Sequence, residues 1–537
     1  MPVPNRVRCF GVCLASLLIG TSTLGPTAAR GADQLQLRLD GLEIPMSLPQ
    51  LEAWSRGPQD LPRGTDLGVW LSLLTPQNRH DLRQMLRAPL LREAGFGRQL
   101  LDSWAGGQML AELGQLLTTP DGRSTTLALQ TTLRRLLQER REVTALELLR
   151  GLPVPRLSLQ LDGLIGMADQ WRLQLSLQRR GLRRLEELAL PQRRVRPRAM
   201  AFLGRPRLRR QELAVAHRSE PLPLEIWSPP PADPPADRPA DRRPLPWLLL
   251  MPGLGGNADQ LGWLAAALAQ RGWWVVVLQH PGSDGPALKA SLEGLRPPPG
   301  AESMAVRLAD AQAVLQAQRQ GVLGVEGEGV VLGGHSLGGL TALIAAGLAP
   351  EPGLVQRCAR AMDRPPIANP SRLLQCQLPT TEQPLPQVAP ADLRGVMVFN
   401  GFGSLLWPGR GVRPLRVPLL LLAGSLDLVT PPLSEQLALF LPAEDRRSRL
   451  VLVDGASHFS PVRVSAREEA LFRVDDALVG VDPETVQGVL LEVSSEFLQT
   501  LQQPSVSIPP QQRIQQGVKA YVLDPPSARQ WQSQMRR

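Results

Sequence analysis

The segment from Val330 to Ala346 constrains the fold more than any other part of this sequence. An apolar, β-branched run leads into Gly-Gly-His-Ser-Leu-Gly-Gly, and a stretch of helical composition follows at once. Gly-x-Ser-x-Gly between a strand and a helix is typical of a nucleophile elbow, a strained turn that raises the serine above the edge of a sheet. We therefore predict that Ser336 is a nucleophile. A plain glycine-rich turn is the alternative, because the pattern also arises by chance.

The residues around the serine agree with a nucleophile elbow. Gly334 and Gly338 lack a Cβ, as the tight turn on either side of the serine requires. The helix that follows offers its N-terminal amides, including that of Leu337, to a developing oxyanion. A second donor is expected from the glycine-rich run 251–256, where the amide of Leu254 is the candidate.

A nucleophilic serine needs a histidine to take its proton and an acid to orient that histidine. Of the five histidines only His458 follows the serine, directly after a predicted strand. The fold that carries this elbow orders its residues as serine, acid and histidine. Asp427, in the turn after a leucine-rich strand, is the predicted acid, and Asp454 is the competitor. His280 and His335 are predicted to be structural.

Residues 1–29 have the pattern of a signal peptide. Two arginines precede an apolar run over 9–20, and Thr27-Ala28-Ala29 offers a cleavage site. The apolar run is too short to indicate a membrane span. We expect an exported protein, periplasmic or secreted, and an uncleaved N-terminal membrane anchor is the alternative.

The four cysteines divide into two pairs. Cys9 and Cys13 lie in the predicted signal peptide. Cys358 and Cys376 form an even pair in the remainder of an exported chain, so a disulfide is expected, with two free thiols as the alternative.

Length and hydrophobic patterning predict two globular parts in this chain of 537 residues. Residues 33–150 show helical spacing after a small hairpin, and an arginine-rich connector occupies 151–210. Over 211–503 strands alternate with helices, which predicts an α/β domain with a doubly wound, mostly parallel sheet. Pro-Ala-Asp repeats predict an exposed insert at 229–244, and weak periodicity predicts a loosely ordered tail at 504–537.

The formal net charge of +10 does not by itself indicate a nucleic-acid partner. Only two residues are lysines, and no nucleic-acid motif with interleaved aromatic residues accompanies the arginines that concentrate between Arg172 and Arg210. We interpret them as a solvated connector, with peripheral contact to anionic membrane lipid as the alternative. The sequence shows no metal-ligand spacing, so neither a metal nor a cofactor is expected.

Five motifs together resemble the predicted dienelactone hydrolases, which are α/β-hydrolases related to platelet-activating-factor acetylhydrolases. They are Pro252-Gly253-Leu254-Gly255, His280-Pro281-Gly282-Ser283, Gly334-His335-Ser336-Leu337-Gly338, Gly424-Ser425-Leu426-Asp427 and Ser457-His458-Phe459-Ser460. The N-terminal part is similar to the domain of unknown function that precedes such hydrolases in cyanobacteria. The resemblance covers about 33–160 and 211–500, and it implies an α/β-hydrolase fold preceded by a smaller, mostly helical domain.

The chain departs from those families at several positions. Dienelactone hydrolase itself uses a cysteine where Ser336 stands, so its activity is not implied. The acetylhydrolases place their acid after the preceding strand, where this chain has Asn400, and this favours Asp427. They usually carry histidine where Pro252 stands. Residues 354–393 occupy the place where this fold carries lids, so we expect a substrate cover pinned by the cysteine pair.

The sequence therefore predicts an exported serine hydrolase that cleaves carboxylic esters through an acyl-enzyme. By resemblance, its small-molecule substrates are short-acyl esters or lipid esters. Two alternatives stay open. One is an interfacial lipase or polyester-type hydrolase. The other is a catalytically silent hydrolase fold that serves as a binding protein of the cell envelope.

Overall fold

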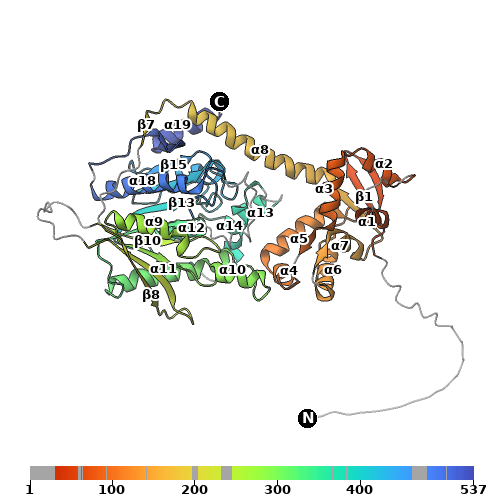
Figure 1. Ribbon diagram of the computed structural model, residues 1–537, viewed down its shortest axis with the longest axis horizontal. Coiled ribbons are helices and arrows are strands. Elements are labelled where there is room, and N and C mark those ends of the chain that lie inside the picture. The colour runs from red at the N-terminus through yellow and green to blue at the C-terminus, as the bar shows by residue number, and fades with distance from the viewer. Residues whose placement is uncertain are drawn as a thin grey trace, which may run out of the picture.

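A computed structural model describes most of the chain from residue 31 to residue 536. It leaves out 58–61, 63, 92–93, 141, 196–203, 232–244, 364–367, 381–384, 463–479 and 504. The predicted signal peptide and most of the proline-rich insert lie outside the described residues. None of the described helices combines the length and apolar character that crossing a membrane requires. Figure 1 shows a smaller N-terminal domain joined by one long helix to a larger domain.

An 11-stranded sheet forms the centre of the larger domain. Its strands are β7 (Gln192–Arg194), β8 (Arg207–Leu213), β9 (Leu222–Ser228), β10 (Trp247–Met251), β11 (Val275–Leu278), β12 (Val330–His335), β13 (Leu393–Phe399), β14 (Leu419–Gly424), β15 (Arg449–Val453), β16 (Gln511–Gln515) and β17 (Val518–Leu523). In space they follow the order β7-β16-β17-β15-β14-β13-β12-β10-β11-β9-β8. The strands from β15 to β11 run parallel, and β9 and β17 flank them antiparallel. The predicted doubly wound, mostly parallel sheet is confirmed.

Helices cover both faces of this sheet, which is why its central strands are apolar throughout. They include α9 (Asp259–Gln270), α11 (Met304–Arg319), α12 (Leu337–Ala345) and α18 (Pro483–Gln502). Along β10, Leu249 and Met251 join the core beneath α11 and α12, whereas Leu248 and Leu250 join the core beneath α9 and α18. The carboxyl ends of the parallel strands meet at one edge, where ligands bind in folds of this kind.

The N-terminal domain combines helices with a four-stranded sheet of order β2-β1-β6-β4 and a two-stranded sheet of β3 and β5. Its elements are β1 (Gln34–Leu39), β2 (Leu42–Ser47), α1 (Leu48–Arg56), α2 (Asp66–Ser72), α3 (Pro76–Arg87), β3 (Pro89–Leu91), α4 (Ala94–Leu101), α5 (Trp104–Leu116), β4 (Leu117–Thr118), α6 (Thr126–Glu139), β5 (Val143–Thr144), α7 (Ala145–Gly151) and β6 (Arg156–Gln160). Ser47 and Thr75 cap α1 and α3 as their sequences indicate. The predicted boundary at residue 150 is too early, because β6 pairs with β1 and buries Leu157 in this domain's core.

The predicted arginine-rich connector is regular structure over much of its length. Helix α8 (Leu161–Glu186) spans from the small domain to the larger one (Figure 1). Its C-terminal half buries Gln178, Gly181 and Leu185, while the arginines of that half remain exposed. The chain then adds β7 to the edge of the main sheet through parallel pairing with β16.

The prediction of a loosely ordered tail after residue 503 is wrong. The hairpin of β16 and β17 extends the sheet beyond β15. Helix α19 (Pro525–Arg536) then packs against α8, where Trp531 is buried and its Nε1 donates a hydrogen bond to the Gly181 carbonyl at 2.8 Å. These strands are short and carry polar residues, so periodicity alone did not reveal them.

We expect Trp531→Ala to destabilise the larger domain by about 3–5 kcal/mol, because it empties a buried aromatic site. Chemical denaturation followed by tryptophan fluorescence and circular dichroism measures this loss. Gln530→Ala, at an exposed neighbouring position, is the control. Equal stability of the two variants would show that the C-terminal helix is not packed.

Candidate active site

Ser336 lies at the sharp turn between β12 and α12. Its backbone adopts φ 51° and ψ −117°, a region that residues with a Cβ rarely occupy. The surrounding structure holds it there, because its N–H donates to the Phe399 carbonyl at 2.9 Å and its own carbonyl accepts from Leu340 N–H at 3.0 Å. The strained backbone is the geometry expected of a nucleophile elbow.

The two elbow glycines are required by close packing of the backbone. A Cβ on Gly334 would lie 2.6 Å from the Met251 carbonyl oxygen and 2.5 Å from the carbonyl carbon of Gly338. A Cβ on Gly338 would lie 2.0 Å from the same Met251 oxygen. Both glycines therefore let α12 start directly against the end of β10, which brings the serine beside the glycine-rich loop.

Asp427 and His458 come together at the same edge of the sheet. Asp427 follows β14 and His458 follows β15, the neighbouring parallel strand. The Nδ1 atom of His458 lies 3.1 Å from Oδ1 and 3.0 Å from Oδ2 of the carboxylate. The His458 ring also lies against the ring of His335, the residue before the serine, with 4.8 Å between ring centroids.

The carboxylate of Asp427 is fully buried and strongly hydrogen-bonded. Its oxygens accept hydrogen bonds from the backbone N–H groups of Val429 and Thr430 and from the Thr430 hydroxyl. Burial disfavours the charged form, but His458 and these donors outweigh it and hold the pKa of Asp427 below its usual value. The predicted competitor Asp454 instead accepts from the Ser425 hydroxyl at 3.1 Å.

Asn400 belongs to this site, a role that the sequence does not predict, since it indicates only that an amide stands where the acetylhydrolases have their acid. Its Nδ2 donates to Oδ2 of Asp427 at 2.6 Å, and its backbone adopts φ 50°. The residue that follows β13 therefore lies in the site, where its side chain hydrogen-bonds the predicted acid instead of serving as the acid. Its position directly after a strand of the sheet was the available signal.

The two predicted oxyanion donors are the backbone amides of Leu337 and Leu254. Leu337 is the first residue of α12, so its amide has no partner four residues earlier within the helix. The amide of Leu254 has no acceptor among the described residues. A Cβ on neighbouring Gly253 would lie 3.3 Å from the Cβ of Ser336, so this loop passes close to the nucleophile.

Arg307 holds the glycine-rich loop 251–256, which carries the predicted oxyanion donor Leu254, and the sequence did not predict this role. It lies in α11, is buried, and donates through Nη2 to the Pro252 carbonyl at 2.5 Å. It also donates to the hydroxyls of Ser283 and Thr341. Burial lowers the pKa of Arg307 to about 9, because desolvation disfavours its charge. An arginine within an ordinary helical pattern gives no sequence signal for this role.

His335 and His280 are structural, as their positions indicated. The Nε2 atom of His335 lies 2.8 Å from the His458 carbonyl and holds the loop that carries the base. Burial and the nearby His458 lower the pKa of His335 to about 3, so its ring is neutral and donates this hydrogen bond. His280 follows β11, and its Nδ1 lies 2.8 Å from the buried carboxylate of Asp310.

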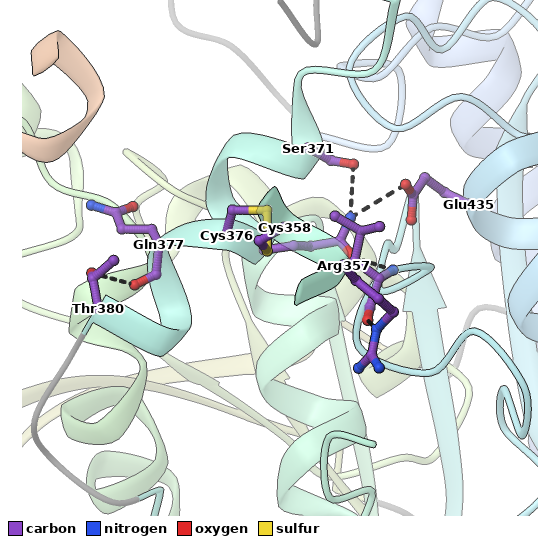
Figure 2. Close-up of a disulfide and its surroundings, with 9 residues drawn as sticks. Arg357, Cys358, Ser371, Cys376, Gln377, Thr380 and Glu435 are labelled. Carbon is purple, nitrogen blue, oxygen red and sulfur yellow. Dashed lines mark hydrogen bonds between the residues drawn. A yellow bond between two sulfur atoms is a disulfide. The ribbon is translucent and has the colours of Figure 1, made fainter. Parts of the chain in front are cut away.

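A disulfide joins Cys358 to Cys376 and connects α13 (Leu354–Ala361) with α14 (Ser371–Gln377) (Figure 2). The segment is attached to the buried carboxylate of Glu435, which lies near Ser371 in the figure and accepts hydrogen bonds from Asn369 and Gln375. The backbone N–H of Ser371 also donates to the Val429 carbonyl, beside the catalytic candidate Asp427. The predicted cover segment is therefore hydrogen-bonded to the turn 425–430 that carries Asp427, which we call the acid turn.

The described residues contain no group of three or more histidine, cysteine, aspartate or glutamate side chains arranged to hold a metal ion. The groups that lie at this edge of the sheet are the Ser336 hydroxyl, the His458 imidazole and the Asp427 carboxylate, together with backbone amides.

We expect stability to fall as the pH is lowered from about 7 to about 4.5. Burial lowers the pKa of His280 to about 4 in the folded chain, whereas the pKa of this histidine in the unfolded chain is about 6.5. The unfolded state binds more protons between these values, so acid favours unfolding by about 2 kcal/mol over this range.

Thermal unfolding of His280→Asn across this range tests the expectation. Asparagine keeps a donor for Asp310 but does not titrate, so the variant should lose less stability in acid than the wild type. His80→Asn, at an exposed position, should behave as the wild type does. The same acid sensitivity in His280→Asn would contradict the assignment.

Comparison with known families agrees with this geometry. Residues 247–473 match the model described as "Alpha/beta hydrolase family". Residues 31–160 match that of "Alpha/beta hydrolase of unknown function (DUF1400)". No curated protein matches the chain. Neither match is specific to dienelactone hydrolases or platelet-activating-factor acetylhydrolases. The larger domain of this chain therefore has the α/β-hydrolase fold, and the two matches support a hydrolase.

Proposed function

We propose that this protein is a serine hydrolase that cleaves carboxylic esters. The observation that carries the proposal is the fully buried Asp427 carboxylate hydrogen-bonded to Nδ1 of His458, at the same sheet edge as the strained elbow of Ser336. A binding protein would not require a strained serine and a buried, ionised acid in one place, because both are costly to maintain.

The proposed reaction begins when Ser336 Oγ attacks the ester carbonyl. His458 accepts the serine proton through Nε2, because Asp427 holds the Nδ1–H tautomer, and then passes the proton to the departing alcohol. The amides of Leu254 and Leu337 stabilise the oxyanion. Water, activated by the same histidine, then attacks the acyl-enzyme and releases the acid and the free serine.

Short-acyl esters are the proposed substrates, with lipid esters of short acyl chain among them. Phe459 and Leu426 flank the acid and the base and are about one-third exposed, at 37% and 38% of their surface, so they offer apolar contact near the reacting carbonyl. Ser336 itself is only 6% exposed. An interfacial lipase would expose a broad apolar surface around 354–407, but Val355 is the one large apolar side chain exposed among the described residues there.

Export is part of the same proposal. The disulfide between Cys358 and Cys376 supports an oxidising compartment, because cytosolic thiols are kept reduced. A signal peptide at residues 1–29 would provide the route.

Hydrolysis of p-nitrophenyl esters from acetyl to long acyl chains tests the proposal. We expect turnover that falls with chain length and is abolished in Ser336→Ala. A preference for long chains would indicate a lipase. Activity equal to that of Ser336→Ala on every ester would leave the binding protein as the better interpretation.

The assignment of the acid has its own test. Asp427→Asn should lower kcat by about 10⁴, because asparagine favours the wrong histidine tautomer. Asp454→Asn is the matched control, since Asp454 contacts a serine hydroxyl instead of the base. A large loss in Asp454→Asn with little loss in Asp427→Asn would reverse the assignment.

A further inference from the structure

One hydrogen bond connects the long helix α8 directly to the acid of the proposed site. Nε2 of Gln178 donates to the backbone carbonyl of Asp427 at 3.1 Å, although the two residues are 249 positions apart in sequence. Gln178 is buried. Among the described residues this carbonyl accepts from no other donor.

Close contacts fix the part of α8 that carries Gln178. A Cβ on Gly181 would lie 2.8 Å from a methyl carbon of Leu433, so the helix approaches the larger domain as closely as glycine allows. The Gly181 carbonyl accepts from Trp531 at 2.8 Å, and Leu185 is fully buried one turn later. The helix therefore presents Gln178 at a defined position.

The acid turn depends on contacts from outside the sheet. Asp427 lies beyond the end of β14, where no strand ladder holds its backbone. Gln178 of α8 holds the turn at the Asp427 carbonyl, and Ser371 of α14 holds it at the Val429 carbonyl. The N-terminal domain contacts both elements, through β1 and α5 on α8 and through α5 on α14.

We propose that Gln178 is a positioning residue for the catalytic acid, and that α8 thereby makes the N-terminal region a working part of the hydrolase site. This inference rests on the proposed function. Gln178 does not contact substrate. It holds the turn so that the Asp427 carboxylate stays aligned with Nδ1 of His458, and loss of the bond lets that turn shift.

A misplaced Asp427 carboxylate changes the pH dependence of kcat/KM. A simple loss of stability does not cause such a change. Asp427 and His335 are the titratable groups that face His458 in the described structure. His335 is neutral at working pH, so Asp427 supplies the charge that stabilises the protonated base. If the carboxylate shifts away, the acid limb of the kcat/KM profile moves to lower pH, because the imidazolium loses its partner.

The experiment measures kcat/KM against pH for full-length Gln178→Ala with the best ester substrate. We expect a drop of about tenfold, because a buried carbonyl is left without its donor, together with an acid limb displaced to lower pH. Gln178→Met, which keeps an unbranched side chain of similar length but lacks the amide donor, should show the same changes.

Two controls separate positioning from general damage. Gln174 lies one turn earlier on α8, and its side chain makes no hydrogen bond among the described residues. Gln174→Ala should therefore match the wild type. Trp531→Phe removes the hydrogen bond from Trp531 to the Gly181 carbonyl of α8 but no contact of the acid turn. It should therefore lower thermal stability and leave the acid limb of the kcat/KM profile in place.

The outcomes distinguish this inference from the proposed function. Wild-type pH profiles and rates in Gln178→Ala, alongside an inactive Ser336→Ala, would overturn the inference alone. A limb displaced equally in Trp531→Phe would also overturn it, because the effect would then belong to helix docking. Activity that survives in Ser336→Ala would overturn the proposed function itself.

Discussion

The buried carboxylate of Asp427 is the constraint on which the proposed site depends. A charge without access to water is tolerated only when donors surround it. Here those donors come from its own turn, from Asn400 at the end of β13 and from His458 after β15. Satisfying one charge thus fixes the relative positions of three loops at the carboxyl edge of the sheet. The orientation of the base follows from the same set of contacts.

The serine side of the site depends on close approach of backbone to backbone. Gly334 and Gly338 let α12 begin against the end of β10, and this places the strained Ser336 beside the loop that carries Leu254. Buried Arg307 then fixes that loop through the Pro252 carbonyl. Strain at the nucleophile persists because the packed sheet, the elbow glycines and this arginine all oppose its relaxation.

The sequence predicted the parts of this structure that local pattern controls. The alternation of apolar strands and helices predicted the parallel sheet. Chain order singled out His458 as the predicted base, and the position of Asp427 after a leucine-rich strand indicated the acid. The sequence did not predict the long-range contacts, because no local pattern indicates that Arg307 hydrogen-bonds Pro252 or that Gln178 hydrogen-bonds Asp427. The C-terminal hairpin was missed for a related reason. Its short strands become recognisable only once β15 is there to pair with.

The most direct test of the central claim is the rate at which a fluorophosphonate labels the protein. Mass spectrometry of the intact chain and of its peptides would follow the reaction. If Asp427 and His458 activate Ser336, the wild type acquires one label, on the peptide that contains Ser336, and Asp427→Asn labels far more slowly. A label on another residue, or an equal rate in both proteins, would contradict the account.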